Sequence, residues 1–358
     1  MVDKEILKYS IALQWLYRTR LRTEHQLLRQ YGDAREAWKH IDELEMKEAL
    51  ERAEEELEFI DKHNISVYLY GTDEYPYRLN ECPDAPTILY GKGNISINNQ
   101  HFVSIVGTRR ATDRGKEMTR QLVLDLAELV PDVTIVSGLA YGIDVAAHKA
   151  AIEAGLPTLI VLGHGLDRIY PHLHRPIAVQ SLKNGGLLTE YVSQTEPFGP
   201  NFVARDRIIA GLADAVVVVE SREKGGSLIT SRMASDYDRE IFAVPGRPSD
   251  PNSLGCNNLI REQNAQLINS AEDIVEAMQW RLMERKPQQT QLVDLMFQLS
   301  DVERTLLDKL HEQEDGMHIN SIVMETGLDY SNVSATLMMM ELNELVKSLP
   351  GGIYRALK

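Results

Sequence analysis

Three loops of the sequence combine glycine with serine, threonine or arginine, a composition suited to holding an anion. They occupy residues 107–115, 137–142 and 225–227, and each follows a short β-branched run and precedes a segment of helical periodicity. At such a junction the backbone N–H groups and the positive end of the helix dipole are exposed, and glycine lets a phosphate approach closely. The three loops therefore predict a phosphate-binding crevice.

The first of these loops is also a local concentration of positive charge. Arg109 and Arg110 open a stretch, residues 108–120, in which Arg and Lys outnumber Asp and Glu, whereas the whole chain has a formal net charge of −15. An acidic protein repels nucleic acid over most of its surface, which argues against indiscriminate binding. We therefore expect phosphate to be held only at a basic focus.

Two further groups of basic residues could border the crevice. Arg205 and Arg207 flank Asp206; they could either form ion pairs involving that carboxylate or act as guanidinium forks on successive phosphates. His172, His174 and Arg175 form the second group, which we interpret as a basic rim. A metal site at these histidines is disfavoured because carboxylates at ligand spacing are nearly absent around them.

Candidates for catalysis are weak. Asp144, Glu190 and Glu220 lie near predicted strand ends, where a carboxylate more often caps a helix or pins a loop than acts as a general base. The sequence has neither the dinucleotide fingerprint nor a P-loop. Its two cysteines, Cys82 and Cys256, are far apart and predict neither a disulfide nor a zinc site. We expect no catalytic residue, metal or cofactor.

The loops must be positioned by a sheet. Short β-branched runs alternate with helical patterns, which predicts a mostly parallel, Rossmann-like α/β sheet covered on both faces. In such a sheet the ligand lies beyond the carboxyl ends of the strands. The predicted strands are residues 103–107, 134–137, 158–163, 187–191, 215–220 and 241–245.

A chain of 358 residues is too long for one hydrophobic core, so several domains are expected. We predict an N-terminal helical domain over residues 1–65, a connector packing on the core over 66–99, the Rossmann-like domain over 100–280, a linker over 281–298 and a winged helix over 299–358. No apolar stretch is long enough to span a bilayer, and the N-terminus does not resemble a signal peptide. We expect a soluble, cytoplasmic protein.

The predicted winged helix has an unusual second helix, residues 330–341. It contains no Lys or Arg, and only Asn332 is suited to reading a base edge. A protein-contact role is therefore favoured over recognition of duplex DNA. The methionine run at 338–340 is interpreted as core.

Several motifs of the central segment occur together in a fixed order. They are VGTR at 106–109, SGLAYGID at 137–144, GLD at 165–167, RDRIIAGL at 205–212, GGSLIT at 225–230 and VPG at 244–246. In this combination the chain resembles the DNA-processing protein A family, also called the Smf or DprA family. The flanking segments are similar to that family's sterile-alpha-motif-like (SAM-like) domain and its winged helix.

The resemblance implies a homodimer that binds single-stranded DNA without sequence preference and helps to load the RecA recombinase during natural transformation. It implies no catalytic activity. Carried over by position, the DNA-binding residues are Gly107, Thr108, Arg109, Arg110, Thr112, Gly115, Ser137, Gly138, Arg205, Arg207, Gly225, Gly226, Ser227 and Thr230.

Three positions depart from the family pattern. Tyr141 stands where the family has Arg, although an aromatic face could stack on a base for about 1–3 kcal/mol. Asp206 weakens the potential between its two arginines, and Asn264 replaces a glycine. These departures predict a DNA affinity below the family norm.

Two other functions are possible alternatives. A nucleotide phosphoribohydrolase has a related fold, but residues 225–230 lack the second glycine spacing and the glutamate of its catalytic loop. A transcription regulator acting through the C-terminal domain is disfavoured by the uncharged second helix.

Overall fold

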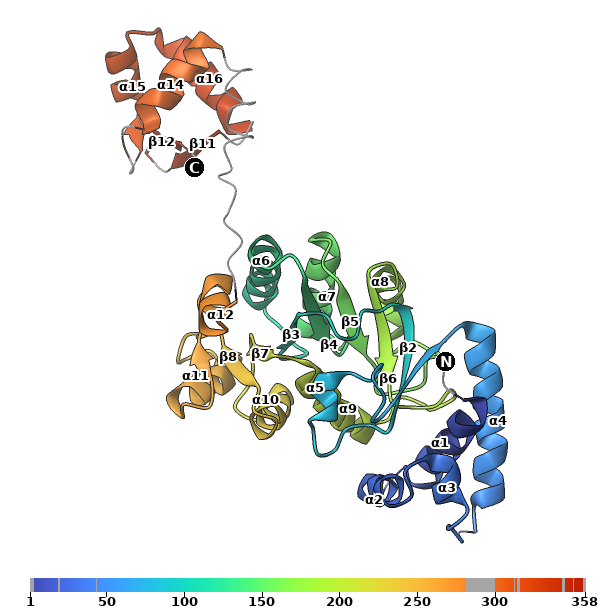
Figure 1. The fold of residues 1–358 in the computed structure, drawn as a ribbon. Helices are drawn as coiled ribbons and strands as arrows, with labels where there is room; N and C mark the ends of the chain where they lie inside the picture. The colour runs from blue at the N-terminus through green and yellow to red at the C-terminus, as the bar shows by residue number, and fades with distance from the viewer. Residues whose placement is uncertain are drawn as a thin grey trace. The chain divides into compact units, whose positions relative to one another are not determined.

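The computed structural model describes residues 3–18, 20–42, 44–280, 300–311, 313, 316–342, 345–349 and 351–356. Its contacts divide the chain into two units, Met1–Glu284 and Arg285–Lys358 (Figure 1). The predicted linker at 281–298 lies outside the described residues. Among the helices that are described, none has the length and apolar character needed to cross a membrane.

A nine-stranded sheet forms the centre of the first unit, in the order β1-β2-β6-β5-β4-β3-β7-β8-β9. The strands from β3 to β9 run parallel. Six of them coincide with the predicted strands, which confirms the mostly parallel Rossmann-like sheet. Their bounds are His101–Val106 (β3), Val133–Ser137 (β4), Thr158–Val161 (β5), Gly185–Thr189 (β6), Ala215–Val218 (β7) and Glu240–Ala243 (β8), and the short β9 is Gln266–Leu267.

Each central strand is buried on both faces because its side chains alternate between two cores. In β3, Val103 and Ile105 enter one core, whereas Phe102 and Val106 enter the other. The β-branched runs of the sequence are therefore continuous instead of alternating with polar residues. Burying a side chain of this kind stabilises the fold by about 1.5–3 kcal/mol.

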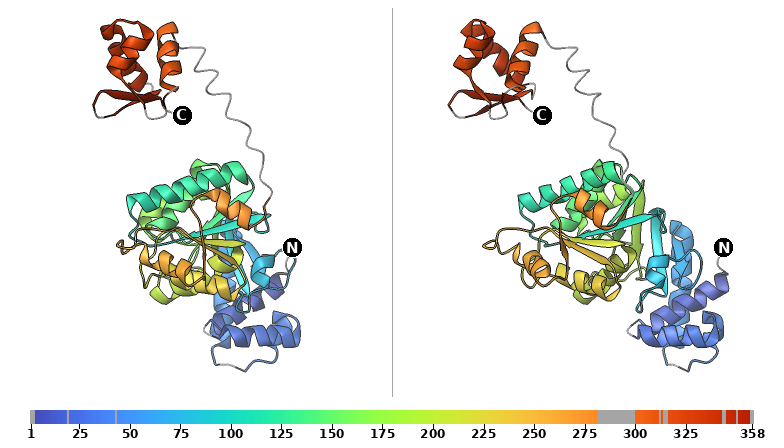
Figure 2. Two further views of the ribbon diagram at one scale, coloured as in Figure 1. Left: turned by 90° about the vertical axis from the view of Figure 1, so that its left-hand side faces the viewer. Right: turned by 60° about the vertical axis from the view of Figure 1, so that its left-hand side comes forward.

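Helices cover the two faces, as Figure 2 shows. One face is covered by α6 (Asp113–Leu129), α7 (Ile143–Glu153), α8 (Arg175–Ser181) and α12 (Ala271–Ala277). The other face is covered by α5 (Tyr77–Asn80), α9 (Gly199–Leu212), α10 (Ser227–Asp236) and α11 (Leu254–Arg261).

Residues 66–99, interpreted above as a connector, supply part of the sheet. β1 (Ser66–Leu69) and β2 (Ile88–Asn94) form its antiparallel edge, with β2 paired to β6. Position 93 requires glycine. Its φ is +128°, which other residues rarely adopt, and an added Cβ would collide with the carbonyl oxygen of Gly185. A segment rich in Pro, Asp and Tyr gives no clear strand pattern, so its sequence did not reveal this edge.

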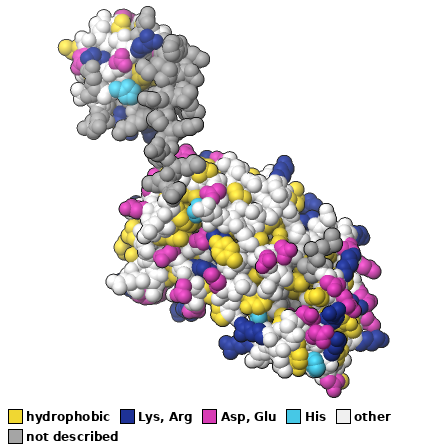
Figure 3. Space-filling view, in the orientation of Figure 1, with side chains coloured by type: hydrophobic (Ala, Val, Ile, Leu, Met, Phe, Trp, Pro, Cys, Tyr) yellow, Lys and Arg dark blue, Asp and Glu magenta, His cyan; other side chains and the backbone are white. Residues whose placement is uncertain are grey.

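The N-terminal helices pack on that edge. They are α1 (Lys4–Leu16), α2 (Leu21–Tyr31), α3 (Ala34–Trp38) and α4 (Met46–His63). Their core continues into the sheet through Leu69, Ile88 and Tyr90. Charged side chains gather over these helices, as Figure 3 shows. Glu56 of α4 is instead buried and accepts hydrogen bonds from Arg52 and from the backbone of Ser193.

The second unit is a winged helix, as predicted. It contains α14 (Asp301–His311), β10 (Met317–His318), α15 (Ile319–Thr326), α16 (Tyr330–Leu342), β11 (Val346–Leu349) and β12 (Ile353–Ala356). The methionine run only partly fills the core: Met340 is buried, whereas Met338 and Met339 are 64% and 54% exposed. Successive helical residues turn by about 100°, so three in a row cannot share one face.

Candidate functional site

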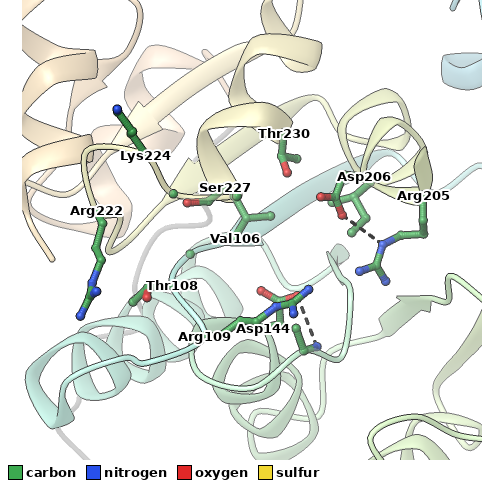
Figure 4. A pocket seen from close by; sticks show the side chains of 15 residues that line it. Val106, Thr108, Arg109, Asp144, Arg205, Asp206, Arg222, Lys224, Ser227 and Thr230 are labelled. Atoms are coloured by element: carbon green, nitrogen blue, oxygen red, sulfur yellow. Dashed lines mark hydrogen bonds and ion pairs between the residues drawn. The ribbon is translucent and has the colours of Figure 1, made fainter. Parts of the chain in front are cut away.

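The three predicted loops meet where the direction of strand addition reverses. The chain proceeds from β3 through β4 and β5 to β6 on one side, and then continues with β7 and β8 on the other. Such a switch point opens a crevice at the carboxyl edge of the sheet. Here the loops after β3, β4 and β7 border a cleft of about 270 Å³ (Figure 4).

Eight of the predicted residues line this cleft. They are Gly107, Thr108, Arg109, Arg205, Gly225, Gly226, Ser227 and Thr230. An added Cβ at Gly226, just before α10, would meet nothing within 4 Å. A ligand can therefore reach the backbone at the start of this helix, where the dipole favours an anion.

Glu220 fixes the first loop against the third. The backbone N–H of Thr112 donates to Glu220 Oε2 at 2.9 Å, and its hydroxyl donates to the other carboxylate oxygen. Thr112 also caps α6 by accepting from Gly115 N at 3.0 Å. An added Cβ at Gly115 would overlap the Glu220 carboxylate. These three residues thus shape the loop, and contact of Thr112 and Gly115 with a ligand stays a prediction.

Arg109, Arg222 and Lys224 supply the positive charge of the cleft. All three are exposed and line it. Among the residues with described positions, no carboxylate lies within ion-pair distance of any of them, and Arg222 Nε instead donates to Asn252 Oδ1 at 3.2 Å. Sequence reasoning missed Arg222 and Lys224, which lie three residues and one residue before the glycine pair of the third loop.

Arg205 lines the cleft and also connects three elements of the fold. Its side chain is 3% exposed, and its Nη1 donates to the carbonyl oxygens of Gly138, at 2.9 Å, and of Val161. Its Nε pairs with Asp206 Oδ1 at 3.1 Å. The guanidinium therefore ties the ends of β4 and β5 to α9 through Nη1 and Nε, and its contact with a phosphate stays a prediction.

Arg207 is directed away from the cleft. Its side chain is 11% exposed and pairs with Glu190, not with Asp206. Residues two apart on a helix point roughly 200° apart, so Arg205 and Arg207 cannot share one ligand. The two arginines therefore do not form a pair in this cleft, whose lining does not include Arg207.

Ser137 and Gly138 are structural too. Ser137 is fully buried and its hydroxyl donates to the carbonyl oxygen of Ile105 at 2.6 Å. Gly138 leaves room for the Arg205 guanidinium, which an added Cβ would meet at 2.5 Å. The Ser137 hydroxyl is therefore occupied inside the protein, and contact of Gly138 with a ligand stays a prediction.

The remaining predicted residues lie outside the cleft lining. Arg110, Tyr141, His172 and Arg175 are exposed. His174, which was expected at the basic rim, is buried, and its Nδ1 lies 2.8 Å from the carbonyl oxygen of Leu139. The ring of Tyr141 packs edge-on against the ring of His174 at 4.9 Å.

Two carboxylates oppose the positive charge of the cleft. Burial raises the pKa of Asp144 to about 6, although the nearby Arg205 guanidinium acts in the opposite direction. Burial likewise raises the pKa of Asp206. Asp144 accepts a hydrogen bond from Ala140 N at 3.4 Å, which agrees with its interpretation as a loop-pinning acceptor. The charge of the cleft consequently depends on pH.

Aromatic rings adjoin the cleft at Arg109. The guanidinium of Arg109 lies 5.9 Å from the ring centroid of Phe202, and the Phe202 ring stacks on Tyr170 with centroids 5.7 Å apart. Tyr170 is 49% exposed. A cation-lined cleft beside an exposed aromatic stack can accommodate both a phosphate and a planar base.

The doubly wound sheet and the anion-accepting cleft at its switch point define a Rossmann-like binding protein. Residues 66–279 match the family described as DNA recombination-mediator protein A, and residues 291–352 match the DprA winged helix domain. The chain belongs to the DNA recombination-mediator protein A family.

Similar proteins extend over most of the chain. Protein Smf of Escherichia coli is 31% identical over 99% of this chain and 96% of its own length. The crystal structure of DNA processing protein A from Streptococcus pneumoniae has a TM-score of 0.64 at 30% identity, covering 77% of this chain and 98% of that one. DNA processing protein A from Helicobacter pylori, whose structure was described for its single-stranded DNA binding mode, has a TM-score of 0.54 at 29% identity, covering 60% of this chain and 95% of that one.

Proposed function

We propose that this protein binds single-stranded DNA, without reading its sequence, along the cleft at the carboxyl edge of the sheet. The observation that carries the proposal is the group formed by Arg109, Arg222 and Lys224 around the open backbone at Gly226. Cations without carboxylate partners can neutralise phosphates and release counterions, a contribution that does not depend on base sequence.

The aromatic stack supports a preference for single strands. Tyr170 exposes half of its surface next to Phe202, and Arg109 joins this stack to the cleft. A strand whose phosphates follow the cleft could place a base on these rings, and such stacking contributes about 1–3 kcal/mol per base. A duplex hides its base faces and gains nothing from them. Tyr141 stays a proposed second stacking residue.

We also propose for this protein the cellular role and the dimeric state that the family resemblance implies. The protein would act without catalysis in the cytoplasm, as a homodimer that brings DNA to the RecA recombinase. The description of the family as recombination mediators supports this role. Two clefts in one dimer would raise the affinity for a long strand through effective concentration.

Fluorescence anisotropy with labelled oligonucleotides tests the proposal. We expect single strands of unrelated sequence to bind equally well, a duplex of the same length to bind more weakly, and affinity to fall as salt is raised. Equal affinity for duplex and single strand, or affinity independent of salt, would contradict it. Release of free base from nucleoside monophosphates would instead favour the phosphoribohydrolase alternative.

A further inference from the structure

The loop after β8 contacts the cleft residues without lining the cleft. It consists of residues 244–253, which connect β8 to α11, and none of them belongs to the lining. One of its side chains, Asn252, nevertheless reaches both neighbouring loops. Its Oδ1 accepts a hydrogen bond from Arg222 Nε at 3.2 Å, and its Nδ2 donates to the carbonyl oxygen of Arg110 at 3.1 Å. Asn252 therefore connects three loops at the carboxyl edge of the sheet.

The two partners fix the orientation of the Asn252 amide. The Nε of a guanidinium can only donate a hydrogen bond, and a backbone carbonyl oxygen can only accept one. The amide oxygen must therefore face Arg222, and the amide NH2 group must face Arg110. Neither aspartate nor alanine can make both contacts, because aspartate lacks the donor and alanine lacks both groups.

The contact with Asn252 holds Arg222 by Nε alone. Among the residues with described positions, nothing forms a hydrogen bond with Nη1 or Nη2 of Arg222. Two adjacent NH2 groups can donate together to two oxygens of one phosphate. The Arg222 side chain extends from the third loop toward the first, where Thr108 lies (Figure 4). The contact thus restricts this long side chain while its phosphate-binding edge stays available.

Asn252 is itself held in place by its backbone. Its carbonyl oxygen accepts from the backbone N–H of Ser221 at 2.8 Å, and its own N–H donates to Asp250 Oδ1 at 3.0 Å. Neither contact involves the amide side chain, so we expect the loop to keep its position when that side chain is shortened. Substitutions at Asn252 therefore remove the contacts with Arg222 and Arg110 selectively.

We propose that Asn252 is a positioning residue of the cleft, which orients the Arg222 guanidinium toward a phosphate of the bound strand. Asn252 does not line the cleft, so it acts on binding through Arg222. A cation that is ordered before binding loses less conformational entropy when it binds, which raises the affinity without a new contact. This inference rests on the proposed function, because it requires Arg222 to contact DNA.

Anisotropy titrations of the full-length protein with a labelled single strand test the inference. We expect Asn252→Ala to weaken binding at least about threefold, the equivalent of one hydrogen bond. In the Arg222→Ala background the same substitution should change the affinity by less than about twofold, because the side chain that it positions is absent. Wild-type affinity of Asn252→Ala would overturn the proposal. Equal weakening in both backgrounds would also overturn it, since Asn252 would then act through the loops in general.

Asn252→Asp provides a second measurement. Aspartate keeps an acceptor for Arg222 Nε but places a negative charge beside the guanidinium. The slope of log affinity against log salt concentration should therefore become shallower by roughly 0.7, as for the loss of one phosphate contact. An unchanged slope would show that this position has no influence on a phosphate-binding cation.

Asn184→Ala is the matched control. Asn184 Nδ2 also donates to a backbone carbonyl oxygen, that of Gly155, at 2.8 Å. Asn184 directly precedes β6 and so lies at the opposite edge of the sheet. This variant loses the same kind of hydrogen bond and should bind the single strand like the wild type.

Arg109→Ala distinguishes failure of this inference from failure of the proposed function. If Arg109→Ala weakens binding and Asn252→Ala does not, the cleft binds DNA and only the role of Asn252 is wrong. If Arg222→Ala binds like the wild type, Arg222 is not part of the interface and the role of Asn252 is excluded, while Arg109→Ala still decides the function of the cleft. Unchanged affinity in all three variants would contradict both proposals.

Discussion

The guanidinium of Arg205 lies against the backbone of Gly138 and donates from Nη1 to its carbonyl oxygen at 2.9 Å. An arginine whose position in the sequence suggests contact with phosphate therefore donates from Nη1 and Nε to groups of the protein itself. The cleft is shaped by this buried group, whereas its exposed charge comes from other residues.

Arg205→Ala should destabilise the protein by about 3–5 kcal/mol, because it leaves the partly buried Asp206 without its cation and two carbonyl groups without a donor. Urea unfolding followed by circular dichroism measures this loss. Arg222→Ala is the control and should change the free energy of unfolding by less than about 0.5 kcal/mol, since Arg222 is exposed. Wild-type stability of Arg205→Ala would show that the contact is dispensable.

The parallel sheet could be predicted because its strands are continuous β-branched runs, as in residues 103–106. The antiparallel edge could not, because β2 includes Gly91 and Gly93 and has no regular pattern. The convergence of the loops also followed from the sequence, since parallel strands end at one edge.

The roles of individual side chains were harder to predict than the loops. The spacing of Arg205 and Arg207 around Asp206 suggests an equivalent pair, yet both lie within α9 and face opposite sides. Lys224 directly precedes the predicted loop at 225–227, and its charge belongs to the same cleft. The direction of a side chain around its helix, and the partners that it meets in the folded protein, decide which cations remain available to a ligand. Neither can be predicted from the spacing of residues in a short segment whose secondary structure is unknown.

Arg109→Ala and Lys224→Ala should each weaken single-strand binding uniformly across sequences. Each variant loses about one phosphate contact, so the slope of log affinity against log salt concentration should become shallower by roughly 0.7. Anisotropy titrations over a series of salt concentrations measure the slope. Lys183→Ala is the control, since this exposed lysine precedes β6 at the opposite edge of the sheet. An unchanged slope in both cleft variants would exclude these cations from the interface.

Glu24 should make the packing of the N-terminal helices sensitive to alkaline pH. Burial raises its pKa from 4.5 to about 8 in the folded protein. A raised pKa contributes stability that is complete below about pH 4.5 and is lost as pH rises through 8, because the buried carboxyl group must then ionise. The contribution of Glu24 to the free energy of unfolding that is lost in this way is on the order of a few kcal/mol.

Glu24→Gln keeps a hydrogen-bond acceptor for Thr87 but cannot ionise. We therefore expect the wild type to lose more thermal stability than this variant between pH 6 and pH 9 (roughly the range in which the group titrates). Glu54→Gln, at an exposed position of α4, should follow the wild type. Parallel pH profiles of wild type and Glu24→Gln would show that Glu24 is not the responsible group.

Asp144 should make DNA binding stronger in mild acid. Its pKa is raised to about 6 by burial, so the carboxylate is charged at pH 7.5 and mostly neutral at pH 5. A negative charge in the cleft repels phosphate, and affinity should therefore rise several-fold as pH falls through 6. Asp206, whose pKa is also raised, would reinforce the same trend.

Asp144→Asn separates this effect from the general titration of the protein. The variant should bind at pH 7.5 with an affinity near that of the wild type in mild acid, and its affinity should change less between these conditions. Anisotropy at constant ionic strength measures both. Asp113→Asn, an exposed position at the start of α6 outside the cleft lining, is the control and should retain the wild-type profile. If Asp144→Asn kept the full pH dependence, the titrating group would have to lie elsewhere, because this side chain could no longer exchange a proton in that range.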